Sequence, residues 1–255
     1  MSLLQRFKKN ELSAVTKNIL VIQPIIYMFV AIFFARVDVR WFFVVTGLLL
    51  LNATILLYKK PVEPQKLVAI LLITLASIGL SASSILTIEK IELLKNPQHV
   101  TSCSLSPIVA CSPVIASKQA TAMGGVPNPI FGIFGFACVL TAGMTILAGA
   151  KNLHKAWWLT LFAGICFGVV FCIWLIHEGV YEIGALCLYC MTTWLVVFTL
   201  FWVVLSELVR SKVISIHSVV DRSLLTYKQG LITATIGLVI LLIYFRWPGY
   251  WNGLL

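Results

Sequence analysis

Two cysteines at the start of a long apolar stretch are the residues of this chain whose spacing most directly suggests chemistry. Cys187 and Cys190 lie in the sequence Gly-Ala-Leu-Cys-Leu-Tyr-Cys-Met-Thr-Thr-Trp, which runs from Gly184 to Trp194. The apolar stretch continues to about residue 208, so both cysteines fall in the first turns of a predicted helix, near the water boundary. Residues three apart share one face of a helix, which suits a reversible disulfide. The positive end of the helix dipole favours a thiolate there, so we expect redox chemistry.

The composition indicates that this pair sits in a membrane protein. Of the 255 residues, 60% are apolar and only 11% are charged, and the mean hydropathy is +0.99. These values are typical of a helical protein that crosses the membrane several times. The formal net charge of +10 does not indicate nucleic-acid binding, because the basic residues form short clusters between apolar stretches, as in loops that flank membrane helices.

Seven apolar stretches are long enough to be membrane helices. They cover about residues 19–35, 41–58, 67–88, 129–149, 156–176, 184–208 and 229–246. The one long connection, 89–128, is expected to be functional because structureless loops of this length are uncommon. The chain therefore divides into an N-terminal extension with two helices (1–66), a core (67–208) and a C-terminal loop with a final helix (209–255). We predict an all-α membrane protein with about seven transmembrane helices.

The distribution of basic residues predicts the orientation of these helices. If the N-terminus is cytoplasmic, 13 of the 19 Lys and Arg residues lie on the cytoplasmic side, in the tail and in the connections 59–66, 150–155 and 209–228. Such an excess is the usual sign of the cytoplasmic side. The long loop and the Cys187–Cys190 pair then face the outside, where disulfides persist.

A second cysteine pair lies in the long loop. Cys103 and Cys111 are separated by seven residues, a loop that can close a disulfide, while Pro107 and Pro113 oppose one continuous helix through it. A purely structural disulfide is one interpretation. The other is exchange with the first pair, since two cysteine pairs on one membrane face permit thiol–disulfide exchange.

The remaining chemistry-bearing residues have simpler interpretations. Cys138, Cys166 and Cys172 lie inside predicted helices, where free cysteines usually serve as packing residues. No metal site is expected, because zinc sites pair a Cys-x-x-C with further ligands at close spacing.

A group of polar residues precedes the Cys187–Cys190 helix. His177, Glu178 and Glu182 lie on the outer turn 177–183, and His99 lies near the other cysteine pair. They could relay protons, but polar residues in short turns are ordinary, so we expect a solvated loop at each place.

Four motifs, taken in order over about residues 67–208, resemble the bacterial branch of the vitamin K epoxide reductase family. They are the C-x7-C loop pair, Ser117, an Asn-Pro-Ile-Phe-Gly helix start at 128–132, and the Cys-x-x-C followed by Thr-Thr. The resemblance implies a four-helix bundle around a quinone, either menaquinone or ubiquinone. It also implies that Cys187–Cys190 is the catalytic pair and that Cys103–Cys111 is a shuttle to a thioredoxin-like partner.

The same resemblance implies the quinone contacts. Asn128 would donate a hydrogen bond to a quinone carbonyl, with Ser117 and Phe131 from the neighbouring motifs also at the site. Trp194 stands where the vertebrate enzymes carry a quinone-contacting Tyr, so an indole N–H replaces the hydroxyl. From the residues alone Asn128 is equally a helix N-cap, because Asn is a favoured cap and Pro129 fits a first helical turn.

The stretch around this motif has two further features. Small residues in the helix 129–149 would let neighbouring helices approach closely: Gly132, Gly135, Ala137 and Gly143. The segment 113–122 would lie as an apolar lid over the mouth of the bundle and exclude water.

Together these observations predict a quinone-dependent thiol oxidase in the bacterial cytoplasmic membrane that makes disulfides outside the cytoplasm. The chain ends about ten residues after the last predicted helix, so its DsbA-like partner is expected to be a separate protein. A DsbB-type oxidase is the alternative within this chemistry, but there the Cys-x-x-C precedes the separated pair. The alternative from another class is a transporter or assembly factor with structural disulfides, which predicts no bound quinone.

Overall fold

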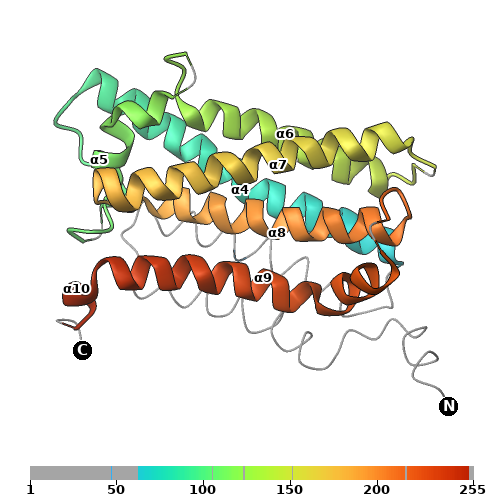
Figure 1. Ribbon diagram of the computed structural model, residues 1–255. Coiled ribbons are helices and arrows are strands. Elements are labelled where there is room, and N and C mark those ends of the chain that lie inside the picture. The colour runs from blue at the N-terminus through green and yellow to red at the C-terminus, as the bar shows by residue number, and fades with distance from the viewer. Residues whose placement is uncertain are drawn as a thin grey trace.

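The protein is a bundle of long helices that run side by side (Figure 1). The computed structural model describes Gly47 and residues 63–252, except positions 105, 123, 151 and 216. Apart from Gly47, the helices predicted at 19–35 and 41–58 lie outside these described residues. Within the described part the regular structure is helical, and an isolated β-bridge joins Val109 and Leu186. The prediction of an all-α protein is therefore confirmed for this part of the chain.

Five helical segments of the described residues are long and apolar enough to cross a membrane. They are α4 (Pro64–Lys95), α6 (Asn128–Leu147), α7 (Lys155–His177) with its continuation η2 (Glu178–Ile183), α8 (Leu188–Arg210) and α9 (Ser218–Arg246). These are the five helices predicted in the described residues, which makes the chain a multi-pass membrane protein. The count of seven helices and the four-helix core stay predictions.

Three short helices lie at one end of the bundle. The segments α5 (Cys111–Ala116) and η1 (Lys118–Thr121) interrupt the long loop, and α10 (Pro248–Asn252) follows α9. Consecutive long helices run in opposite directions, so this end also holds the end of α4, the starts of α6 and α8, and the end of α9 (Figure 1). We call it the cysteine end, because Cys103, Cys111 and Cys187 all lie there.

Helix α4 is the element on which the bundle is assembled. It packs along α6 on one side and along α8 on another, while α7 and α9 pack on α8. The α4–α6 contact is close because glycines face it: a Cβ on Gly143 would lie 3.1 Å from the carbonyl oxygen of Ala69, and one on Gly79 would meet the ring of Phe136 at 2.5 Å. Gly135 does not take part, since a Cβ there meets no atom within 4 Å. Some of the predicted small residues, but not all, therefore allow the close approach of α4 and α6.

Several predicted boundaries are wrong, and the reason is the same in each case. Helix α4 continues to Lys95, so the long loop begins later than 89, and α9 begins at Ser218, within the connection predicted at 209–228. Hydropathy marks the part of a helix that lies in lipid, whereas a helix continues into water until its caps end it. For α9 the cap is the His217 side chain, whose Nδ1 accepts a hydrogen bond from the Val219 N–H.

The predicted outer turn 177–183 is also wrong, because the chain remains helical there. Helix α7 passes directly into the π-helical turn η2, a form that is often found at functional sites. Gly184 ends it with a φ of +70°, in the left-handed region that favours glycine. The next three residues are not helical, and α8 therefore starts at Leu188 rather than at 184.

Candidate redox-active site

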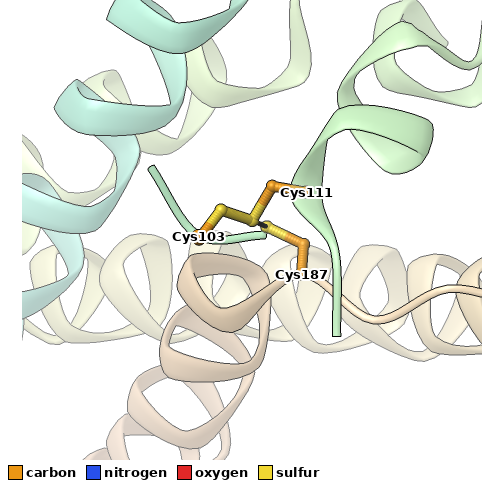
Figure 2. A group of neighbouring side chains, drawn as sticks. All are labelled: Cys103, Cys111 and Cys187. Carbon is orange, nitrogen blue, oxygen red and sulfur yellow. Dashed lines mark hydrogen bonds between the residues drawn. A yellow bond between two sulfur atoms is a disulfide. The ribbon is translucent and has the colours of Figure 1, made fainter. Parts of the chain in front are cut away.

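Three of the cysteines meet at the cysteine end of the bundle (Figure 2). Cys103 and Cys111 form a disulfide with their Cα atoms 5.6 Å apart, as expected for a loop of this length. The Sγ of Cys187 lies 3.0 Å from the Sγ of Cys111. All three side chains are buried, with exposed fractions of 0%, 0% and 1%. The structure therefore brings the two predicted pairs into contact through Cys111 and Cys187.

Cys187 is the N-cap of α8, and Cys190 follows in its first turn. The Sγ of Cys187 accepts a hydrogen bond from the Cys190 N–H, with the two atoms 3.4 Å apart. Both cysteines are free thiols, and Cys190 is half-buried against the same apolar cluster. The helix start thus holds one sulfur of the Cys-x-x-C pair at the disulfide and the other one turn deeper.

A backbone contact aligns the two pairs. The Leu186 N–H donates to the carbonyl oxygen of Ile108 over 2.8 Å, and Val109 and Leu186 form a parallel bridge. Cys187 directly follows Leu186, and Cys111 comes two residues after Val109. The bridge therefore places the two cysteine side chains next to each other. A short turn precedes it, in which Ser106 and Val109 exchange two hydrogen bonds.

The segment before Cys103 is held by polar contacts that sequence reasoning missed. Buried Glu89 accepts a hydrogen bond from the Ser102 N–H at 3.0 Å and pairs with His99 Nε2 at 2.8 Å. Tyr189, which is fully buried among the cysteines, has its hydroxyl 3.2 Å from that of Ser102. His99 is thus held by a buried carboxylate, while the residues beside it, 94–98 and Val100, are exposed as expected for a solvated loop. The one hint in the sequence was a carboxylate directly after an apolar stretch and just before the cysteine loop.

Asn128 holds the segment that covers the site rather than a helix end. Its Nδ2 donates to the carbonyl oxygen of Gln119 at 2.6 Å, and its Oδ1 accepts from the Ala122 N–H at 3.1 Å. The N-cap of α6 is Pro127, and the Asn128 side chain makes no capping hydrogen bond. The capping interpretation is wrong, because the residue lies inside the first turn, where its amide faces η1.

Contacts besides those of Asn128 also hold the segment that covers the site, residues 111–122, which we call the covering segment. Ile115 is buried against the cysteine cluster, and the Ser117 hydroxyl donates to the carbonyl oxygen of Val114 at 2.7 Å. Gln119 Nε2 donates to a carboxylate oxygen of Glu178 at 3.1 Å, which ties η1 to η2. Glu178 is therefore a structural contact and not part of a solvated loop.

The other polar residues predicted near this region face outward. His177 and Glu182 are exposed on α7 and η2. Phe131, three residues after Asn128, is partly exposed on α6. The structure thus separates these three side chains from the buried contacts of the covering segment.

Trp194 lies one helical turn after Cys190, on the same side of α8. Its ring is 4% exposed, in an apolar cluster that includes Cys172 and Cys190. Its indole Nε1 is the one buried side-chain nitrogen or oxygen without a hydrogen-bond partner in the described part of the chain. Since buried polar groups are nearly always paired, this N–H is a place where a bound molecule with an acceptor would fit.

The three cysteines outside the two pairs differ in their surroundings. Cys172 is buried beside Trp194, as expected for a packing residue, and Cys166 is half-buried. Cys138 is exposed on α6, so it does not pack inside the bundle.

The geometry agrees with a comparison against known families. Residues 70–205, more than half of the chain, match the Vitamin K epoxide reductase family. A comparison with curated proteins gives no match. The matched segment contains the disulfide, the Cys-x-x-C and the helices that position them, which is the resemblance that the motifs predicted. The chain therefore belongs to the vitamin K epoxide reductase family of membrane redox proteins.

Proposed function

We propose that this protein is a quinone-dependent thiol oxidase that passes electrons from a thioredoxin-like partner to the membrane. The observation that carries the proposal is the 3.0 Å contact between the sulfurs of Cys111 and Cys187, which links the loop disulfide to the Cys-x-x-C pair. A structural disulfide alone does not need a free thiol held against one of its sulfurs. Such an arrangement is what thiol–disulfide exchange requires, because a thiolate attacks a sulfur of the disulfide directly.

The reaction begins at the loop pair. A partner thiolate attacks Cys103, breaks the Cys103–Cys111 bond and releases Cys111 as a thiolate. The second thiol of the partner then displaces Cys103. The partner leaves as a disulfide, and both loop cysteines are reduced by its two electrons.

Internal transfer follows between the two pairs. The Cys111 thiolate attacks the Cys187 sulfur of an oxidised Cys187–Cys190 pair, and Cys190 leaves as a thiolate. Cys103 then attacks Cys111, which restores the loop disulfide and releases Cys187 as the second thiol. The covalent state in Figure 2, with the loop pair joined and Cys187 free beside Cys111, is the product of this step.

A quinone supplies the acceptor that takes two electrons and two protons when the Cys187–Cys190 disulfide re-forms. Among the described residues, Trp194 fits it best, because its buried Nε1 has no hydrogen-bond partner in that part of the chain. Within the described residues, one amide hydrogen of Asn128 is used by Gln119, which leaves its second hydrogen for an acceptor on a quinone. Ser117 already donates its hydroxyl hydrogen to Val114 and keeps only acceptor capacity. Phe131 is partly exposed on α6 and separate from these buried contacts, so it would contribute only an outward-facing apolar surface. Menaquinone and ubiquinone both carry the carbonyl acceptors that these donors require.

The distribution of charge supports an orientation with the cysteine end outside the cytoplasm. Five basic residues lie at the opposite end of the described helices (Lys66, Lys155, Arg210, Lys212 and Arg222), against four at the cysteine end (Lys90, Lys95, Lys118 and Arg246). Such clusters mark the cytoplasmic side of a membrane protein. The cysteine end then faces the compartment in which a DsbA-like partner and stable disulfides are found in bacteria.

Trapping of exchange intermediates tests the proposal. In Cys103→Ser, Cys111 has lost the thiol that resolves it, so a Cys111–Cys187 bond should accumulate. With the loop disulfide intact, a partner that lacks its second thiol attacks Cys103 and releases Cys111, but it cannot displace Cys103, so it should remain as a covalent adduct there. Mass spectrometry of non-reduced peptides would identify both species, and Cys138→Ser, which removes an exposed cysteine, should behave as the parent.

The opposite outcome is equally clear. If Cys103→Ser contains only a Cys187–Cys190 bond and keeps the activity of the parent, the loop pair is a structural disulfide. The proposed electron route through Cys103 and Cys111 would then be wrong.

A further inference from the structure

Two consecutive charged residues at the end of α4, Glu89 and Lys90, hold the two halves of the loop disulfide. Their exposed fractions are 8% and 9%, although the residues sit in a helix that ends in water. Charged side chains are almost never this buried unless they are paired. Neighbouring positions on a helix point in directions about 100° apart, so the two side chains reach different parts of the loop.

Glu89 contacts the half that contains Cys103. One carboxylate oxygen accepts from the Ser102 N–H, directly before Cys103, and the other pairs with His99 Nε2. In this arrangement the exposed fraction of Cys103 is 0%. A partner thiol cannot reach a sulfur that is fully covered, so the segment 99–103 has to move away before the partner reacts.

Lys90 contacts the half that contains Cys111. Its Nζ donates to the carbonyl oxygen of Ile115 at 2.7 Å. Ile115 is in the last turn of α5, and Cys111 is the first residue of that six-residue helix. A cation on a terminal carbonyl stabilises the end of a helix, and here it also fixes the direction in which α5 presents Cys111 to Cys187.

We propose that Glu89 and Lys90 are positioning residues with separate tasks in the exchange. Glu89, with His99, keeps Cys103 covered and controls the entry of the partner thiol, whereas Lys90 keeps Cys111 against Cys187 for internal transfer. The inference rests on the proposed function, because it assigns partner entry to Cys103 and internal transfer to Cys111. If both residues only stabilised the fold, replacing either one would have the same effect. The proposal instead predicts that replacing Glu89 exposes Cys103, whereas replacing Lys90 slows formation of the Cys111–Cys187 bond.

Thiol labelling tests the task of Glu89 without a quinone or a partner. In the Cys111→Ser background, Glu89→Ala should raise the rate at which a maleimide labels Cys103 by about tenfold or more, because the segment loses two hydrogen bonds to a charged group. Glu89→Gln keeps an acceptor for the Ser102 N–H and should give a smaller increase. Glu92→Ala, which removes an exposed carboxylate from the same helix, is the matched control and should change nothing.

The labelling of Cys172 separates local opening from unfolding. This buried cysteine lies in a different cluster, beside Trp194, and its labelling rate should stay the same in Glu89→Ala. Equal increases at both cysteines would show that the variant only loosens the fold. Unchanged labelling of Cys103 would show that Glu89 does not cover it. Either result overturns the assignment, whatever becomes of the proposed oxidase activity.

The rate at which the Cys111–Cys187 bond forms tests the task of Lys90. In the Cys103→Ser background, Lys90→Met keeps the apolar stem and removes the ammonium group, so the Cys111–Cys187 bond should form about tenfold more slowly. Labelling of Cys103 in the Cys111→Ser background should stay slow in Lys90→Met. If Lys90→Met instead exposes Cys103 as Glu89→Ala does, the division of tasks is wrong. A failure to form the bond even with Lys90 present would contradict the proposed function itself.

Discussion

Replacing Trp194 by Phe should weaken quinone use with almost no change in stability. The substitution removes the unpartnered N–H and keeps an aromatic ring in the same apolar cluster. Removing an unsatisfied buried donor stabilises the protein by about 1–3 kcal/mol. The smaller ring loses about 2 kcal/mol of apolar burial, at roughly 0.8 kcal/mol per buried carbon group. The two effects nearly cancel, so the free energy of unfolding should change by about 1 kcal/mol or less.

The effect on the reaction has no such compensation. If the indole N–H donates to a quinone carbonyl, its loss removes a buried hydrogen bond of about 1–2 kcal/mol, and the KM for quinone should rise roughly tenfold. The assay follows quinone absorbance while a dithiol is oxidised, with thermal unfolding in detergent measured on the same samples. The KM for the dithiol should stay close to that of the parent, because Trp194 lies beyond Cys190 and away from the loop pair.

Trp202→Phe is the matched control for this experiment. The indole Nε1 of Trp202, on α8, donates to the Thr235 hydroxyl of α9 at 3.0 Å. Replacing Trp202 by Phe removes this hydrogen bond between the two helices. Trp202→Phe should therefore lower the unfolding temperature and leave the KM for quinone unchanged. The reasoning is refuted if Trp194→Phe behaves in the same way, with lower stability and unchanged quinone kinetics. The unpartnered N–H would then be a packing cost without a ligand.

Three other predictions concern the cover, the helix packing and the orientation. Asn128→Ala should raise the KM for quinone roughly tenfold and increase proteolysis of the segment 117–122, because the amide holds that segment by two hydrogen bonds. Intact quinone kinetics would leave Asn128 only the role of holding the cover. Gly143→Ala should destabilise the protein by about 1–3 kcal/mol in thermal unfolding, because a Cβ there approaches α4 backbone, whereas Gly135→Ala should be neutral. Cysteines introduced at 91–100 should react with impermeant reagents in intact cells and those at 209–228 should not, and the reverse result would invert the orientation.

The features that the sequence could predict are those that depend on neighbouring residues. Five membrane helices follow from runs of apolar residues, and the closure of Cys103 on Cys111 follows from a short loop. The position of Cys187 and Cys190 near a helix start follows from the apolar stretch behind them, although the helix begins at Leu188 and not at the predicted 184. Each of these is a property of one segment, so a single sequence contains enough information to predict it.

The features that could not be predicted depend on contacts between distant segments. The hydrogen bond from Leu186 to Ile108 joins residues 78 apart and leaves no pattern in either segment, because any residue except proline can donate it. Asn128 was expected either to cap its helix or to bind a ligand. Its actual partners, in η1, are known only once the loop is folded over α6. The boundaries failed for a different reason, since hydropathy detects lipid contact and not the end of a helix.

The burial of the cysteines has a consequence for how such a site would work. Exchange between Cys111 and Cys187 needs no motion over a distance, because their sulfurs are already 3.0 Å apart. Entry of an outside thiol does need a motion, because Cys103 is fully covered. A site with these two properties transfers electrons inward readily and reacts slowly with unrelated thiols. Selectivity would then come from the partner's ability to displace the segment that Glu89 holds, rather than from the reactivity of the sulfurs.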